Sequence, residues 1–160
     1  MRALRLLSGL LALLLSGAVA ASGIEIIAGD ELPALGPYVP ATVAGGVVYT
    51  SGQVAFDVER GRIVGEDIRT QTRQALHNLR AVLAAAGSSL EHTLRVTVYL
   101  KNPEDFPVMN EVYQEFFRKH KPARSTVPGV AWGKGVLVEI DAIALQIRNQ
   151  PVTDSIIRAE

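Results

Sequence analysis

Three secondary-structure patterns follow one another in QTRQALHNLRAVLAAAGSSLEHTLRVTVYLKNPEDFPVMNEVYQEFF, residues 71–117. At its start, and in the few residues before it, apolar side chains recur at three and four positions between Asp67 and Ala86. Polar side chains, among them His77, fill the opposite face, where we expect them to be solvated. The spacing predicts an amphipathic helix over 67–86 that ends at Gly87.

The middle of the stretch alternates with a period of two. In LRVTVYL, residues 94–100, one face carries Leu94, Val96, Val98 and Leu100, and the residues between them form the other face. This alternation predicts a half-buried strand with the four apolar side chains on its buried side.

The last part of the stretch carries the start signals of a second helix. Asn102 is a candidate N-cap, Pro103 occupies the first helical position and two acidic residues follow it. Pro107 is unfavourable inside a helix, so we expect the regular turns to begin only there. The apolar stripe of this helix consists of Phe106, Met109, Tyr113, Phe116 and Phe117.

Short strands are expected on both sides of this stretch. The Gly- and Pro-rich segment near the N-terminus offers only one, at Ile24–Ile27, and two more follow at Val47–Thr50 and near Val54–Phe56. After the second helix we expect a strand at Ser125–Val127 and a longer, alternating one at Val136–Ile147. The order β-β-β-α-β-α-β-β predicts an α+β fold, in which two helices pack on one face of a mixed β-sheet.

The last strand has apolar side chains on both faces. Leu137, Ile143 and Leu145 share one face with Glu139 and Asp141, while the opposite face carries the apolar residues Val136, Val138, Ile140, Ala142 and Ala144. The first three would form an exposed apolar patch unless another surface covered them. We therefore expect subunits to associate through this face of the sheet.

The first twenty residues, MRALRLLSGLLALLLSGAVA, have the layout of a secretory signal. Two arginines precede an apolar run, and small residues stand before a cleavage position at Ala21. The run is shorter than the roughly 20 residues that span a bilayer, so we expect cleavage and a periplasmic or secreted protein without stable membrane insertion. An uncleaved anchor and a buried helix are the alternatives. Residues 21–148 are predicted to form one domain, followed by a C-terminal extension at 149–160.

Composition argues against several classes of function. Lys plus Arg and Asp plus Glu balance at 16 each, so no basic field indicates a nucleic-acid partner. The chain has no cysteine, which removes disulfides and thiolate nucleophiles. The histidines lack metal-ligand spacing, the serines lack a hydrolase elbow and neither glycine-rich nucleotide signature occurs. We expect no metal site and no bound nucleotide.

A few side chains are candidates for binding or chemistry. Arg124 lies outside any helix stripe, and its guanidinium could form the planar fork that binds a carboxylate. Glu139, on the last strand, could handle a water molecule. An ordinary surface salt bridge is the alternative explanation for these two charges. Tyr38, Ser51 and Asn110 sit at loops or helix starts, where a turn or capping role is the default.

The chain resembles the Rid family of reactive intermediate deaminases (RidA/YjgF) in successive blocks. The blocks are GPYVPATVAGGVVYTSGQVAFD, the residues 71–117 quoted above, PARSTV and VEIDAIA. The likeness covers nearly all of residues 36–144 in unbroken order. The resemblance implies a chorismate-mutase-like α+β fold and a homotrimer with ligand clefts between its subunits. It also implies a reaction without a cofactor, the hydrolysis of enamine or imine intermediates such as 2-aminoacrylate to a 2-keto acid and ammonia.

The resemblance also assigns roles to the candidate residues. Arg124, in the P-x-R-S motif, is expected to bind the substrate carboxylate, and Glu139 to position or activate the attacking water. Tyr38 of the G-P-Y block, Ser51 of the S-G-Q block and Asn110 before the aromatic stripe would line the cleft as substrate-binding residues.

Two classes of function remain open at this point. One is an exported enamine/imine deaminase, a hydrolase that acts on C=N bonds of small carboxylates. The other is a non-catalytic trimer that binds a small carboxylate such as a keto acid, or acts as a chaperone. The presence of both Arg124 and Glu139 favours the enzyme, because an arginine alone would suffice for binding.

Overall fold

The computed structural model describes residues 23–32, 35–130, 133 and 135–147. Its strands and helices, in chain order, are β1 (Glu25–Ile27), β2 (Ala41–Ala44), β3 (Val47–Thr50), β4 (Phe56–Asp57), β5 (Arg62–Ile63), α1 (Ile68–Ala85), β6 (Thr93–Leu100), α2 (Phe106–Phe116), β7 (Ala123–Pro128) and β8 (Val138–Leu145), with single 3₁₀ turns at Leu90–His92 and Pro103–Asp105. The predicted signal peptide at 1–20 and C-terminal extension at 149–160 lie outside the described residues.

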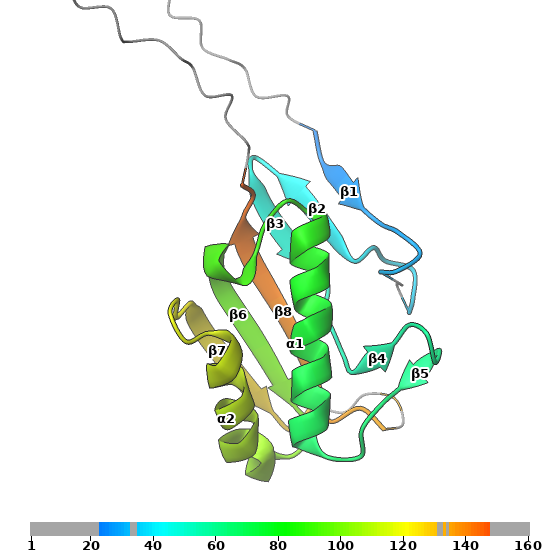
Figure 1. The fold of residues 1–160 in the computed structure, drawn as a ribbon, viewed down its shortest axis with the longest axis vertical. Helices are drawn as coiled ribbons and strands as arrows, with labels where there is room; N and C mark the ends of the chain where they lie inside the picture. The colour runs from blue at the N-terminus through cyan, green and yellow to red at the C-terminus, as the bar shows by residue number, and fades with distance from the viewer. Residues whose placement is uncertain (1–22, 33–34, 131–132, 134, 148–160) are drawn as a thin grey trace, which may run out of the picture.

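Six strands form one mixed sheet in the order β1-β2-β3-β8-β6-β7, and α1 and α2 cover one face of it (Figure 1). Only β6 and β7 run parallel, and the other neighbours are antiparallel. The strands β4 and β5 form a separate hairpin beside α1. The α+β class, with a mixed sheet and two helices on one face, is confirmed.

Capping fixes both ends of α1. Asp67 precedes the helix, and its carboxylate accepts a hydrogen bond from the backbone N–H of Thr70 at 2.9 Å. At the other end Gly87 adopts φ +69°, and the N–H of Ser88 donates to the carbonyl of Leu83 at 2.8 Å. This is a Schellman ending, which needs a left-handed residue after the last turn. The predicted end of the helix at Gly87 is confirmed.

The core lies between the helices and the two central strands. Alternate residues of β6 and β8, including Val96, Val98 and Ile140, have no exposed surface and pack toward the helices. Gln71 of α1 is equally buried, and its side chain bonds the carbonyls of Gly65 and Gly135 and the N–H of Leu137. A buried amide with three backbone partners ties the start of α1 to the segment that enters β8.

The register of β6 differs from the predicted alternation at its first residues. Thr93 pairs with Ala144 and Arg95 with Ile143, so Leu94 is an extra residue in a β-bulge. The bulge turns Thr93 into the core and leaves Leu94 46% exposed. The expectation that Leu94 shares the buried face is therefore wrong, whereas it holds for the rest of the strand.

A strand that the sequence interpretation did not include precedes β3. β2 forms a hairpin with β3 through Gly45 and Gly46, which have φ of 59° and 79°. Two adjacent residues with positive φ are what a tight two-residue hairpin requires, and glycine adopts them without strain. The Gly-Gly pair was thus the available signal for this hairpin.

Three local expectations need correction. Asn102 makes no capping bond to the backbone; it precedes a 3₁₀ turn, and α2 begins at Phe106, close to the expected start at Pro107. His77 is half-buried rather than fully solvated, with its ring 5.1 Å from that of Phe116. Leu137 precedes β8 and packs against the core instead of the open face of the sheet.

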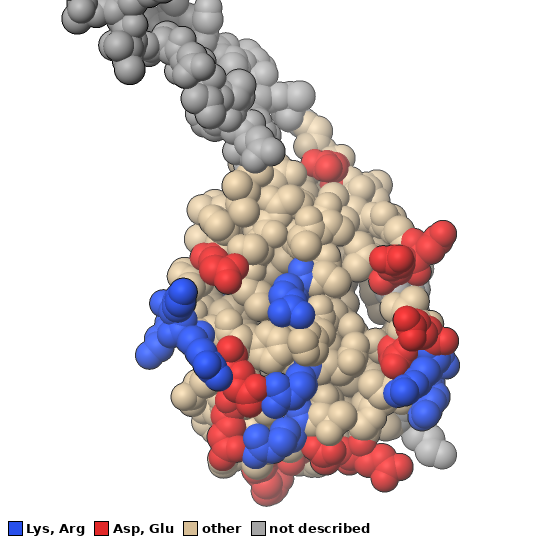
Figure 2. Space-filling view, in the orientation of Figure 1, with Lys and Arg blue, Asp and Glu red and all other residues tan. Residues whose placement is uncertain are grey.

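The polar face of α1 is otherwise as expected. Basic side chains run along this helix with acidic ones beside them (Figure 2). Arg69 pairs with Glu111 and Arg73 with Glu115, which links α1 to α2 across the surface. Within the described residues, no helix is long and apolar enough to cross a membrane.

Candidate functional site

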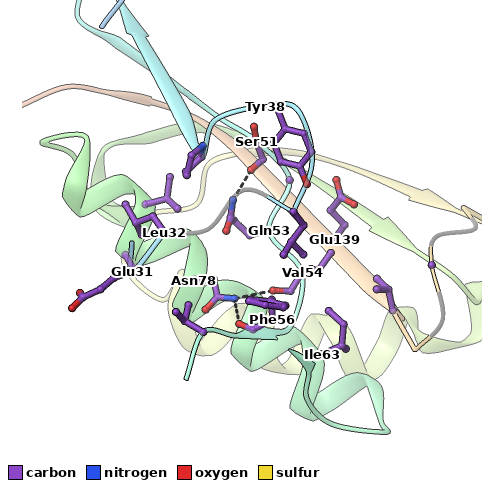
Figure 3. Close-up of a pocket in the computed structure, with 18 residues that line it drawn as sticks. Glu31, Leu32, Tyr38, Ser51, Gln53, Val54, Phe56, Ile63, Asn78 and Glu139 are labelled. Atoms are coloured by element: carbon purple, nitrogen blue, oxygen red, sulfur yellow. Dashed lines mark hydrogen bonds between the residues drawn. The ribbon is translucent and has the colours of Figure 1, made fainter. Parts of the chain in front are cut away.

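A cavity of about 690 Å³ opens between α1, the β4–β5 hairpin and the segment that contains Tyr38 (Figure 3). Tyr38, Ser51 and Glu139, three of the five predicted site residues, line it. They come from the loop before β2, the position that follows β3 and the second residue of β8. The fold therefore gathers residues that are up to about a hundred positions apart in the chain.

Hydrogen bonds hold the wall of this cavity in place. The Ser51 hydroxyl donates to the carbonyl of Val39 at 2.6 Å, which fixes the loop that carries Tyr38. Gln53 exchanges two backbone hydrogen bonds with Ile140, at 2.8 and 2.9 Å, which fixes the wall to β8. The hydroxyl proton of Ser51 is thereby used, and its oxygen can accept a hydrogen bond from a ligand.

Gly52 determines where the carboxylate of Glu139 can lie. A Cβ atom built at Gly52 would overlap the Glu139 carboxylate, so the side chain of Glu139 occupies the space that the glycine leaves. Glu139 is half-buried there. The sequence interpretation treated Ser51-Gly52 only as a break between strands. It missed that this glycine makes room for a candidate catalytic group.

A second tyrosine lies next to Glu139 across the sheet. Tyr99 of β6 is the register partner of Glu139, and Asp141 lies two positions further along β8. Burial raises the pKa of the Tyr99 hydroxyl, and the Asp141 carboxylate raises it further. Tyr99 therefore stays protonated at neutral pH and is a hydrogen-bond donor beside two carboxyl groups.

Arg124 lies elsewhere, on the edge strand β7. The central carbon of its guanidinium is 4.5 Å from the ring centroid of Tyr113 and 5.8 Å from that of Phe106, both on α2. A cation over aromatic faces is attracted by their π electrons, so these rings hold the guanidinium. Burial raises the pKa of Tyr113 to about 12, although the charge of Arg124 acts against this shift. Tyr113 therefore remains neutral beside the cation.

Asn110 belongs with Arg124. It is half-buried within α2, four residues after Phe106 and three before Tyr113, so it shares their side of the helix. The expectation that Asn110 sits at a loop or a helix start is wrong, because it lies in the middle of α2. The five candidates thus form two groups: the glutamate group (Tyr38, Ser51 and Glu139) and the arginine group (Asn110 and Arg124).

The two groups lie on opposite faces of the sheet. Arg124 on β7 pairs with Val96 of β6, whose side chain points into the core beneath the helices. Glu139 on β8 pairs with Tyr99 of β6. Val96 and Tyr99 are three residues apart on one strand, so their side chains, and those of their partners, point to opposite faces. The strand β6 also lies between β7, which carries Arg124, and β8, which carries Glu139. Two strand spacings place the backbones of β7 and β8 roughly 10 Å apart. One chain therefore does not bring Arg124 and Glu139 to the same small molecule. The same geometry excludes a salt bridge between them within one chain.

The comparison with protein families assigns the chain. The family model described as Endoribonuclease L-PSP matches residues 28–146. The chain belongs to this family. The match spans every strand and helix of the L-PSP domain from β2 to β8, including all five candidate residues.

Curated relatives and a solved structure support the L-PSP assignment. The chain is 48% identical to a RutC family protein of Pyrococcus horikoshii over 75% of this chain and 96% of the relative. It is 40% identical to the 2-iminobutanoate/2-iminopropanoate deaminase of Salmonella typhimurium over 76% and 98%. The crystal structure of Escherichia coli TdcF with bound serine matches with a TM-score of 0.71 and 38% identity, covering 77% and 99%. The resemblance to the Rid family is thereby confirmed at the level of the family.

Within this L-PSP domain the described residues contain no group of three or more His, Asp or Glu side chains that could hold a metal ion. The polar groups of the candidate site are instead a carboxylate, a guanidinium, an amide and hydroxyls. Such groups can bind a small carboxylate and orient water.

Proposed function

We propose that this protein hydrolyses reactive enamine and imine intermediates of small carboxylates to 2-keto acids and ammonia, in clefts between the subunits of a homotrimer. The observation that carries the proposal is the placement of Glu139, whose carboxylate fills the space over Gly52 at the wall of an open cavity. A relative at 40% identity is named as a deaminase of this kind, and the similar TdcF structure holds serine, a small amino carboxylate.

The chemistry needs a bound carboxylate and one directed water molecule. Arg124 pairs with the substrate carboxylate through two parallel hydrogen bonds. Glu139 accepts a proton from water as the oxygen attacks the imine carbon, and it passes this proton to the imine nitrogen to give a carbinolamine. Collapse of the carbinolamine moves its O–H proton to the nitrogen through Glu139, forms the keto C=O bond and releases ammonia by breaking the C–N bond. Water and imine are thus consumed, keto acid and ammonia are formed, and the glutamate returns to its starting state.

A cleft between subunits resolves the separation of the two groups. If the arginine group of one subunit faces the glutamate group of its neighbour, Arg124 and Glu139 meet although they lie on opposite faces within each chain. Closed rings of identical subunits use such a contact between two different surfaces. Asn110 would then enter the cleft with Arg124, and Tyr38 and Ser51 would enter it with Glu139.

The open face of the sheet supports association. Ile26, Tyr49 and Ile143 lie in one register row on this face, and Tyr49 is 46% exposed in the single chain. Leu145 is 45% exposed on the same face. The exposed row favours association, and the resemblance to the Rid family implies three subunits, so static light scattering of residues 21–160 should give three times the monomer mass. A stable monomer at micromolar concentration would contradict the proposed cleft as well as the assembly.

Export is a second part of the proposal, and it rests on the sequence of residues 1–20 alone. In a bacterial host that expresses the full chain, the protein should be found outside the cytoplasm with its N-terminus at or near Ala21. Fractionation followed by N-terminal sequencing measures both. A cytoplasmic pool that retains Met1 would be evidence against export.

The enzyme proposal is tested by the release of ammonia. Imino acids can be generated in place from L-amino acids with an amino-acid oxidase and catalase, and semicarbazide captures what the protein leaves unreacted. The protein should accelerate ammonia release and lower the yield of semicarbazone. If the protein binds 2-keto acids but ammonia is released no faster than without it, the protein is a non-catalytic binding protein and the enzyme proposal is wrong.

Gly52→Ala should lower turnover roughly tenfold or more, because the added Cβ displaces the Glu139 carboxylate from its position. Gly29→Ala is the matched control, since a Cβ there meets nothing within 4 Å. Steady-state kinetics and urea unfolding should be measured for both variants. Parental turnover in a folded Gly52→Ala protein would show that this placement of Glu139 is not needed.

A further inference from the structure

The cavity at Glu139 continues into an apolar recess that the candidate residues do not use. We define the recess by Leu32, Val54, Phe56, Ile63, Ala81 and Val82, which line the same cavity. Figure 3 shows Tyr38, Ser51 and Glu139 toward one end of the cavity and Leu32, Phe56 and Ile63 toward the other. The recess is thus formed by α1, by the β4–β5 hairpin with the segment that leads into it, and by Leu32 from the segment before β2.

Asn78, a polar residue of α1 that lines the cavity, forms its hydrogen bonds within the protein. The amide nitrogen of Asn78 donates to the carbonyls of Val54 and Phe56 at 2.9 and 2.8 Å, and its oxygen accepts from Gln74 at 2.9 Å. Both of its N–H groups and one lone pair of its oxygen are therefore used in holding the wall. Glu31, which lines the cavity beside Leu32, is exposed, so its carboxylate can stay in contact with water. The recess therefore offers a ligand mainly apolar contact.

The size of the cavity exceeds what the smallest substrates need. Pockets of about 300–1,000 Å³ enclose ligands much larger than a carboxylate with three or four carbon atoms. A 690 Å³ cavity with one polar end and one apolar end matches a molecule with the same division. An amino-acid-derived imine with a long side chain has this form, because its carboxylate and C=N group are at one end.

We infer that the recess binds the side chain of the substrate and selects imines, and the corresponding 2-keto acids, that carry a branched aliphatic or aromatic side chain. The inference rests on the proposed function for the position of the reactive carbon, beside Glu139. Each additional methylene group that leaves water for an apolar site strengthens binding severalfold. A side chain with three additional carbon atoms should therefore gain roughly tenfold to hundredfold in affinity.

Binding of stable keto acids tests the recess without any need for turnover. Pyruvate and 4-methyl-2-oxopentanoate are the probes, and calorimetry on the full assembly gives both dissociation constants. The parent should bind 4-methyl-2-oxopentanoate at least tenfold more tightly than pyruvate. Equal affinity for the two probes, or no binding of either, would overturn the inference.

Two variants that fill the recess and one matched control locate the effect. Ala81 is an exposed residue of α1 that lines the cavity, so Ala81→Phe places a ring at the recess from the helix side. Val58→Trp fills it from the hairpin side, where Val58 is 42% exposed. Ala84→Phe changes an exposed residue of the same helix outside the lining.

Both filling variants should reduce the preference for 4-methyl-2-oxopentanoate to about twofold while the affinity for pyruvate changes little. Ala84→Phe should keep the preference of the parent. If the filling variants keep it too, the side chain binds elsewhere and the inference fails.

Measuring imine turnover in parallel separates this inference from the proposed function. Ammonia release from imines without a keto-acid preference would support the enzyme and overturn the recess. A keto-acid preference that the filling variants abolish, without ammonia release, would support the recess and overturn the enzyme.

Discussion

Glu139→Gln should lower the turnover of an imino acid roughly 100-fold or more and leave the affinity for a keto acid nearly unchanged. Glutamine has the shape of the glutamate side chain, so the space over Gly52 stays filled. It cannot accept the proton of the attacking water at neutral pH. The loss should therefore appear in kcat, measured by ammonia release, while calorimetry with a 2-keto acid reports intact binding.

Glu104→Gln is the control for this substitution, because Glu104 is an exposed glutamate in the 3₁₀ turn before α2 and outside the cavity lining. It should retain the kcat of the parent. If Glu139→Gln deaminates imines at the parental rate, Glu139 does not activate water. Water would then have to be activated by another group of the cleft.

Arg124→Lys should weaken ligand binding and kcat/KM together, by roughly tenfold or more. Lysine keeps the positive charge but cannot form two parallel hydrogen bonds to a carboxylate. It also lacks the planar guanidinium that lies over the rings of Tyr113 and Phe106. Calorimetry with a keto acid and steady-state kinetics should show losses of similar size.

Arg118→Lys provides the comparison, since Arg118 is an exposed arginine just after α2. Arg118→Lys should leave the dissociation constant for the keto acid and kcat/KM at the values of the parent. Unchanged keto-acid affinity in Arg124→Lys would show that the guanidinium fork is not the carboxylate anchor. Binding lost in the Arg124 variant and chemistry lost in the Glu139 variant would together assign the two roles.

The helices and the central strands could be predicted from the sequence because their apolar periods are long and their ends are marked. Asp67 and Gly87 delimit α1 as expected, β8 alternates over its eight residues, and β6 alternates from Val96 to Leu100. The strand β3 was predicted at its observed bounds, but its hairpin partner β2 was missed, because the small residues of ATVA (Ala41–Ala44) give little hydrophobic signal. The bulge at Leu94 was missed because it depends on the register with β8, which the sequence of β6 alone does not contain.

The identities of the candidate residues followed from the resemblance to the Rid family, but their arrangement did not. Arg124 and Glu139 are fifteen positions apart, and their faces depend on two strand pairings, one parallel and one antiparallel, on either side of β6. The role of Gly52 was equally hidden, because it consists of space left for a side chain from a distant strand. Contacts across the sheet, and not local pattern, determine both features.

Mixed assemblies test most directly whether Arg124 and Glu139 act together across a subunit boundary. Arg124→Lys and Glu139→Gln chains with different tags can be refolded together, and assemblies that carry both tags isolated. A cleft that joins two subunits then sometimes combines an intact Arg124 with an intact Glu139. Random assembly in equal amounts leaves about a quarter of such clefts intact. The account predicts that the co-refolded mixture, before tag selection, releases ammonia at about a quarter of the parental rate. This rate should be clearly above that of either variant alone. Activity no higher than the average of the two variants, from chains shown to share assemblies, would contradict it.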